Sequence, residues 1–83
     1  MRLRVILDLD LSEILWAMPK ARRQEIVATM EMMADSPFIP GDSFSTDDTG
    51  RTLHHHTFGR WRFTYWVDGA VNELRILHVR RDS

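Results

Sequence analysis

The chain has no cysteine among its 83 residues and no apolar run long enough to cross a membrane. Without cysteine it can form no disulfide bond and use no thiolate, which fits a reducing compartment. The longest apolar run, Ile14 to Met18, falls far short of a bilayer span. The apolar patch at the amino terminus is too brief for a secretory signal, and Asp8 and Asp10 follow it. We therefore expect a cytoplasmic protein with no membrane partner, folded as a single domain over residues 1–83.

The chain also has little net charge, −1 with neutral histidines, but its two parts differ in sign. Residues 1–50 carry five basic and nine acidic side chains, a balance of −4. Residues 51–83 carry six basic and three acidic ones, a balance of +3, together with all four histidines and the only tyrosine. A cationic segment rich in arginine, histidine and aromatic side chains is suited to a polyanion or to phosphoryl chemistry.

Apolar spacing in the first part predicts one strand followed by a helical hairpin. Leu3, Val5 and Leu7 alternate with other positions, the period of a partly buried strand. We expect Asp10 to cap the first helix, and Pro19 to stand in the first turn of the second. The predicted buried faces have helical spacing and comprise Leu11, Ile14, Leu15 and Met18, then Ile26, Val27, Met30, Met33 and Ala34.

The second part predicts three strands after a long irregular connection over residues 38–50. The strands are expected at about 51–58, 60–67 and 72–80. In the middle one, two sets of side chains point to opposite faces: Trp61, Phe63, Tyr65 and Val67 on one, Arg60, Arg62, Thr64 and Trp66 on the other. The predicted fold is α+β in the order β-α-α-β-β-β, a helical hairpin packed on a four-stranded, mainly antiparallel sheet.

Four short motifs accompany this order: Met-Pro-Lys between the helices, Ala-Asp-Ser-Pro closing the second helix at Ser36 and Pro37, Gly-Arg-Trp-Arg-Phe-Thr-Tyr-Trp-Val-Asp at the third strand, and Ile-Leu-His-Val-Arg-Arg-Asp at the end. Together they cover nearly the whole chain, which resembles the RelE/ParE superfamily of type II toxins. The resemblance implies a cognate antitoxin as partner. It also implies one of two activities: ribosome-dependent cleavage of mRNA, as in the RelE branch, or inhibition of DNA gyrase without catalysis, as in the ParE branch. A toxin-fold module that only binds protein is the third possibility.

The resemblance also implies site residues for a metal-independent endoribonuclease. By position, Arg62 matches the arginine that RelE-type nucleases aim at the scissile phosphate, and Arg81 matches a second catalytic basic residue. His54 and His56 stand where those nucleases place basic residues on the preceding strand. The chain stops at Ser83, before the terminal tyrosine of several ribonuclease branches.

Residue chemistry supports the same set. Imidazole suits proton transfer near neutral pH, and guanidinium binds two phosphate oxygens at once. We expect Arg62 and Arg81 to clamp a phosphate while His54, His56 or His78 moves the proton. On an ideal strand His78 lies opposite Arg81, so both can serve one site only with a bulge. Arg80, which is in phase with His78, is the substitute.

Three further groups are candidates for binding. Arg60, Arg80 and the cluster Lys20, Arg22 and Arg23 at the start of the second helix are candidate RNA or phosphate contacts. Trp16, Met32 and Trp66 lie off the buried faces, which predicts a docking surface for an antitoxin segment; packing of Trp66 in the core is the alternative. His54 and His56, with His78, have a spacing that zinc can use, but few other ligands lie in phase, so we predict neither metal nor cofactor.

Overall fold

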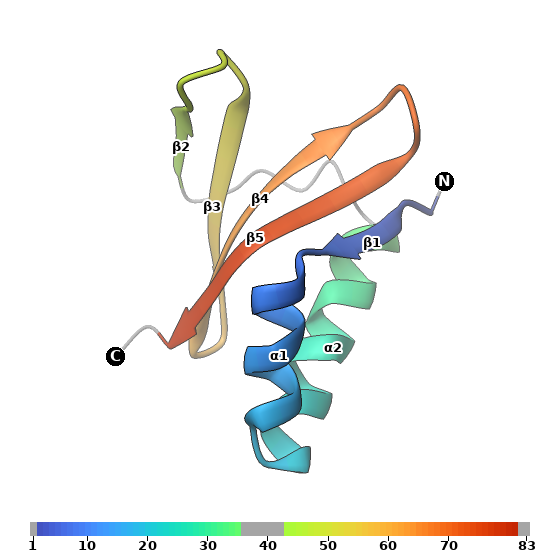
Figure 1. Ribbon diagram of the computed structural model, residues 1–83, viewed down its shortest axis with the longest axis vertical. Coiled ribbons are helices and arrows are strands. Elements are labelled where there is room, and N and C mark those ends of the chain that lie inside the picture. Colours follow the sequence, from blue (N-terminus) through green and yellow to red (C-terminus); the bar gives the residue numbers. More distant parts are fainter. Residues whose placement is uncertain (1, 36–42, 82–83) are drawn as a thin grey trace.

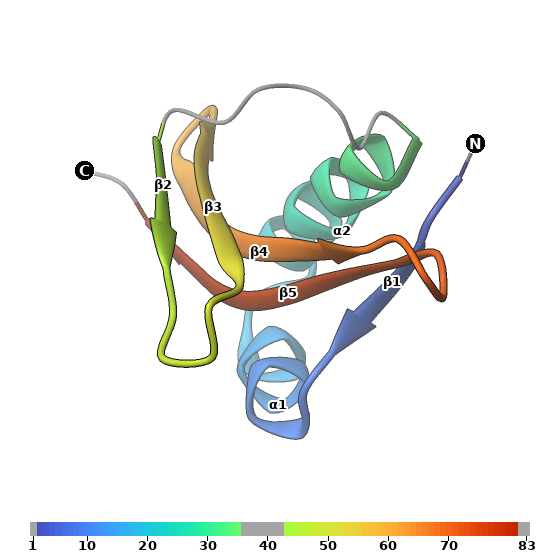
Figure 2. The same ribbon diagram turned by 90° about the horizontal axis from the view of Figure 1, so that it is seen from above.

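The computed structural model describes residues 2–35 and 43–81, which form two helices and a five-stranded sheet (Figure 1). In chain order the elements are β1 (Arg4–Leu7), α1 (Leu9–Ala17), α2 (Lys20–Asp35), β2 (Ser43–Thr46), β3 (Thr52–Phe58), β4 (Trp61–Asp68) and β5 (Glu73–Arg81). The sheet order is β1-β5-β4-β3-β2, with β1 parallel to β5 and the other neighbours antiparallel (Figure 2). The predicted α+β class and helical hairpin are confirmed. Within the described ranges, neither helix has the length and apolar character that a membrane span requires.

The predicted strand count of four was too low by one. β2 lies within residues 38–50, which we expected to be irregular, and it pairs antiparallel with β3. All four of its side chains are exposed, so the segment has no apolar alternation from which a strand could be predicted. Ser36 and Pro37, the predicted end of the second helix, lie outside the described residues; α2 is described to Asp35.

The first helix begins earlier than the sequence predicted. Asp8, not Asp10, is the N-cap: its Oδ1 accepts a hydrogen bond of 2.7 Å from the backbone N–H of Leu11. Asp10 instead lies in the first turn of α1, where its charge still favours the helix. In α2 the carbonyl of Pro19 accepts the first hydrogen bond, from the backbone N–H of Arg23 at 3.1 Å.

The core lies between the helices and one face of the sheet. Leu11 and Leu15 of α1 are buried, whereas Ile14, which we expected beside them, is 52% exposed. Val27 of α2 is likewise exposed at 39%. The rest of the core comes from α2, the segment before β1, and the helix side of β4 and β5: Leu3, Ile26, Met30, Met33, Ala34, Trp61, Phe63, Tyr65, Leu74 and Ile76.

A β-bulge in β5 decides which of its residues face the helices. Thr64 of β4 pairs with His78, but the next residue, Tyr65, pairs with Ile76, so Leu77 is an extra residue on β5. An extra residue reverses the alternation beyond it. Ile76 before the bulge and Val79 after it therefore both pack on the core side.

Candidate functional site

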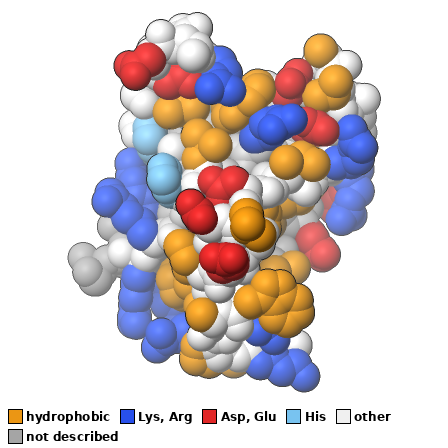
Figure 3. Space-filling view, viewed as in Figure 1, with side chains coloured by type: hydrophobic (Ala, Val, Ile, Leu, Met, Phe, Trp, Pro, Cys, Tyr) orange, Lys and Arg blue, Asp and Glu red, His pale blue; other side chains and the backbone are white. Residues whose placement is uncertain are grey.

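A hollow of about 710 Å³ lies on the open face of the sheet, the face away from the helices. We call it the basic hollow; its lining comes from β2, β3, β4 and β5 and comprises Ser43, Phe44, Ser45, His55, Arg62, Thr64, His78, Val79 and Arg80. Figure 3 shows Lys and Arg side chains (blue) along the left edge of the molecule, with two histidines (pale blue) beside the upper ones.

Strand register sets two cations opposite each other in this hollow. Arg62 on β4 pairs directly with Arg80 on β5, and the bulge at Leu77 turns both Arg80 and His78 to the open face. Arg62 is half-buried and donates from Nη2 to Ser43 Oγ at 3.4 Å. Within residues 2–35 and 43–81, no carboxylate forms an ion pair with Arg62 or Arg80. Since like charges opposite each other repel, this pair is suited to an anion between them.

Two histidines lie in the next row of the same face. His78 pairs with Thr64 and is exposed, and His55 pairs with Thr64 from the other side. The His55 ring has a hydroxyl at each nitrogen: Thr64 Oγ1 at 3.1 Å from Nδ1 and Ser45 Oγ at 2.9 Å from Nε2. This ring therefore links β2, β3 and β4 through its side chain.

The sequence prediction missed His55, although the sequence carries the signal for it. Gly59 and Arg60 form a two-residue turn that pairs Phe58 with Trp61, and Gly59 has φ +60° as a type II′ turn requires. Once that turn is assigned, counting back along the hairpin pairs His55 with Thr64 on the open face.

His54 and His56 lie on the opposite face, which corrects the expectation that they flank Arg62. They pair with Tyr65 and Phe63, whose side chains are in the core. The His54 ring stacks on Tyr65 with centroids 5.5 Å apart, and the His56 ring stacks on Phe58 at 3.9 Å.

Arg81 is also separated from Arg62. It pairs with Trp61, a core residue, and so lies on the helix side of the sheet. The expected convergence of Arg62 and Arg81 is therefore wrong, and Arg80 occupies the place beside Arg62. His78 is likewise across the sheet from His54 and His56, and in the described part of the chain no three histidine or carboxylate side chains gather in a way that could hold a metal.

The remaining predicted RNA contacts lie away from the basic hollow. Arg60, in the β3–β4 turn, donates two hydrogen bonds to Glu25 of α2, at 2.8 and 3.3 Å. The Arg60 guanidinium lowers the pKa of the Glu25 carboxyl. Arg23 lies over the Trp16 ring, 4.8 Å from its centroid. Lys20 and Arg22 are exposed on α2, without an ion pair among the described residues.

The three predicted docking residues do not share one surface. Trp16 on α1 and Met32 on α2 are exposed, at 74% and 43%. Trp66 lies across the sheet from the helices, on the open face that the sequence predicted for it. It is half-buried there and outside the core cluster.

Comparison with known proteins gives a match in structure alone. No protein-family model matches the sequence, and no curated protein matches it. A chain of the archaeal RelE–RelB complex from Pyrococcus horikoshii OT3 matches with a TM-score of 0.74 and 18% identity, over 100% of this chain and 98% of that chain. A chain of the toxin–antitoxin complex RelBE2 from Mycobacterium tuberculosis matches with a TM-score of 0.78 and 16% identity, over 98% of this chain and 99% of that chain.

The chain has a RelE-like fold. The resemblance read from the sequence is thus confirmed at the level of the fold. Both matches extend along nearly the full length, so the RelE-like fold includes the helical hairpin as well as the sheet that carries the basic hollow.

Proposed function

We propose that this protein is the toxin of a type II toxin–antitoxin module and that it cleaves mRNA on the ribosome without a metal cofactor. The RelE-like fold supports the toxin role, because both matching structures are toxin–antitoxin complexes. A cognate antitoxin is the expected partner. The single observation that carries the nuclease activity is the direct cross-strand facing of Arg62 and Arg80, with His78 in the adjacent row.

In this proposal Arg62 and Arg80 hold the scissile phosphate. Each guanidinium can bind two phosphate oxygens, and together they offset the charge that builds up on the pentacovalent phosphorane. Their mutual repulsion is relieved when the anion lies between them. Positive charge at the reacting phosphate therefore comes from the chain's own side chains.

His78 is the proposed proton-transfer residue. Cleavage requires the 2′-hydroxyl to lose its proton as its oxygen attacks phosphorus, and the departing 5′-oxygen to gain one. His78 is exposed, and imidazole is the side chain best suited to such a proton transfer. His55 has both ring nitrogens engaged by hydroxyls, so we assign it to holding Thr64 and Ser45 at the wall of the hollow.

Growth arrest in cells tests the proposal. Induction of the wild type should arrest growth and give cuts in mRNA that primer extension maps to codon ends, whereas the Arg62→Ala, Arg80→Ala double variant should give neither. The matched control is Arg81→Ala, which removes a neighbouring arginine on the other face and should behave as wild type. Circular dichroism checks that all three proteins fold.

Other outcomes identify the rival functions. Arrest that persists in the double variant, with SOS induction and blocked DNA supercoiling, would replace the nuclease by a gyrase inhibitor. Absence of toxicity in the wild type and in both variants, with retained binding to a neighbouring gene product, would leave a protein-binding module.

A further inference from the structure

Trp66 lies on the open face between two arginines. The guanidinium carbon of Arg51 is 4.6 Å from the centroid of the indole ring, and that of Arg75 is 5.7 Å away. Trp66 and Arg75 are cross-strand partners on β4 and β5, and Arg51 immediately precedes β3. We call these three residues the Trp66 stack.

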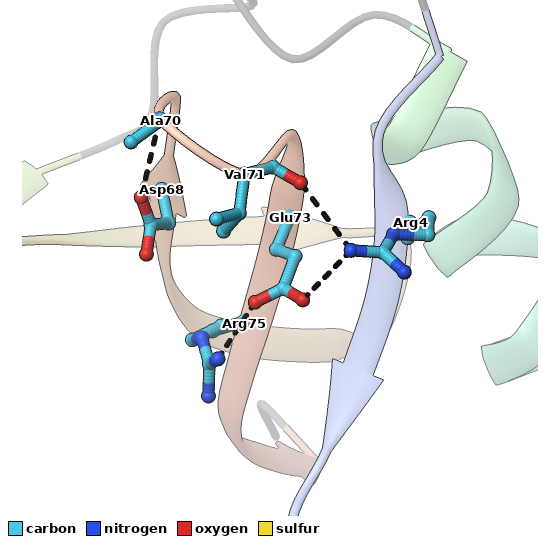
Figure 4. A network of polar contacts seen from close by, with 6 residues as sticks. All are labelled: Arg4, Asp68, Ala70, Val71, Glu73 and Arg75. Atoms are coloured by element: carbon cyan, nitrogen blue, oxygen red, sulfur yellow. Dashed lines mark hydrogen bonds and ion pairs between the residues drawn. The ribbon is translucent and has the colours of Figure 1, made fainter.

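Carboxylates hold both arginines of the Trp66 stack in position. Arg51 Nε donates to Asp47 Oδ2 at 2.9 Å, and Arg75 Nη2 donates to Glu73 Oε1 at 2.6 Å. Glu73 is buried, and its other oxygen accepts from Arg4 Nη2 at 3.1 Å. Figure 4 shows the Glu73 carboxylate between Arg4 and Arg75. The guanidinium planes are thus ordered before any ligand arrives, which lowers the entropy cost of binding.

The Trp66 stack is in line with the basic hollow. Arg62, Thr64 and Trp66 are successive residues of the open face on β4. Trp66 lies four residue steps along the strand from Arg62, or about 13 Å at 3.3–3.4 Å per residue. A single strand of RNA whose phosphate lies between Arg62 and Arg80 passes over Trp66 if it continues along β4.

We propose that the Trp66 stack is a second subsite for the same RNA strand, where an unpaired base extends the stack of indole and guanidinium planes. This inference rests on the proposed function. Unpaired bases stack on aromatic rings and on guanidinium planes, and such stacking binds single-stranded nucleic acid without sequence preference. The charged side chains around the stack are three arginines, Arg4, Arg51 and Arg75, and three acids, Asp47, Asp68 and Glu73, so their formal charges balance and the stack would bind RNA through its ring and guanidinium planes.

Equilibrium binding of RNA oligomers tests the subsite. The probes carry 2′-O-methyl groups, which remove the attacking hydroxyl, and come in two lengths: one fills only the basic hollow, and the other also reaches Trp66. Trp66→Leu should weaken binding of the long probe by about 5- to 150-fold, the loss of one base–aromatic stack, and leave the short probe unchanged. Trp16→Leu is the matched control, since it removes a tryptophan exposed on α1, and should leave both probes unchanged.

Two additional variants separate stacking from folding. Trp66→Tyr keeps an aromatic face and should restore most of the affinity that Trp66→Leu loses. Arg51→Ala removes one guanidinium and should reduce the dependence of affinity on salt by about one unit of slope. An abasic nucleotide placed over the stack should weaken binding to the wild type but add nothing to the loss in Trp66→Leu.

The outcomes distinguish this inference from the proposed function. Suppose that the Arg62→Ala, Arg80→Ala variant binds neither probe while Trp66→Leu binds both as tightly as wild type. The inference of a subsite at Trp66 is then wrong, and the proposed nuclease site stands. If the double variant binds as wild type, the basic hollow is not the RNA site, whatever Trp66 does. If Trp66→Leu keeps RNA binding but loses the antitoxin complex, the stack is a protein-docking surface and the subsite is wrong.

Discussion

The two faces of the sheet carry different kinds of side chain: apolar and buried on the helix side, charged or only half-buried on the open face. On the helix side of β4, Trp61, Phe63 and Tyr65 are buried among the helices, and the hydrophobic effect accounts for each of them. On the open face of the same strand, Arg62 and Trp66 are only half-buried. Two arginines face each other there, an arrangement that packing does not require and that costs repulsion.

This difference indicates which face carries stability and which carries function. The residues of the helix side are those that any chain of this fold needs in some form, because two helices must cover an apolar sheet face. The open-face residues bury little apolar surface and so add little to stability. Their charges and aromatic rings can therefore contact a ligand without loss of the fold. If this division is right, neighbouring residues on one strand should respond in opposite ways to substitution.

The largest expected effect separates two such neighbours. Phe63 is fully buried, so Phe63→Ala should lower the free energy of unfolding by about 3–5 kcal/mol. Arg62→Ala, one residue away, should change it by about 0.5 kcal/mol or less. Urea unfolding followed by circular dichroism measures both. A loss of comparable size in Arg62→Ala would mean that the open face is also structural.

The next effect compares two adjacent arginines of β5. Arg80 faces Arg62, whereas Arg81 lies across the sheet, so Arg80→Ala should lower kcat for cleavage of ribosome-bound mRNA by about 10²–10³-fold. Arg81→Ala should retain wild-type kcat. Single-turnover kinetics on programmed ribosomes measures both. The reverse ranking would restore the assignment that the family resemblance implied for Arg81.

Much of the helix side could be predicted from the sequence. The apolar spacing that predicts the helical hairpin and the strand around Phe63 depends on burial, which leaves a strong pattern along the chain. Ile14 and Val27 have the same helical spacing and are nevertheless exposed, so the pattern places the edge of a buried face poorly. The other errors lie at positions where burial leaves no pattern. β2 has only exposed side chains, and Asp8 and Asp10 are equally plausible caps until the hydrogen bond to Leu11 is seen.

The open face was harder to predict because it depends on register. The bulge at Leu77 puts Arg80 rather than Arg81 beside Arg62, and an apolar segment such as Ile76 to Val79 does not reveal where an extra residue lies. The sequence could have predicted that His55, rather than His54 and His56, lies on the open face, because the short turn at Gly59 fixes the hairpin pairing. A histidine run matches either register equally well, so only the turn could decide.

A smaller effect concerns the attachment of β2 to the open face. His55→Ala removes hydrogen bonds to Ser45 and Thr64 and should lower the free energy of unfolding by about 1–2 kcal/mol. Ser45→Ala removes only the bond to β2 and should cost about half of that. Hydrogen exchange of the β2 amides should rise in both variants. Unchanged exchange would show that backbone pairing alone holds this edge strand.

The smallest effects come from two half-buried carboxylates, one on each side of the sheet. The hydrogen bond from Arg60 lowers the pKa of Glu25 below its usual 4.5. The Thr49 hydroxyl, followed by the backbone of Arg51 and of Thr49, lowers the pKa of Asp47 from 3.8 to about 2. Because both folded pKa values lie below the unfolded ones, each group stabilises the fold at neutral pH and loses that contribution as the pH falls.

The two carboxylates should therefore lose their contributions in sequence during acid titration. The Glu25 contribution declines once the pH falls below about 4.5, and that of Asp47 declines between 3.8 and about 2. Urea unfolding at a series of pH values should give a shallower acid slope for Glu25→Gln in the higher window and for Asp47→Asn in the lower one. Identical slopes in wild type and Asp47→Asn would mean that Asp47 does not hold Arg51 beside Trp66 in solution, and the order of the open face would then need another source.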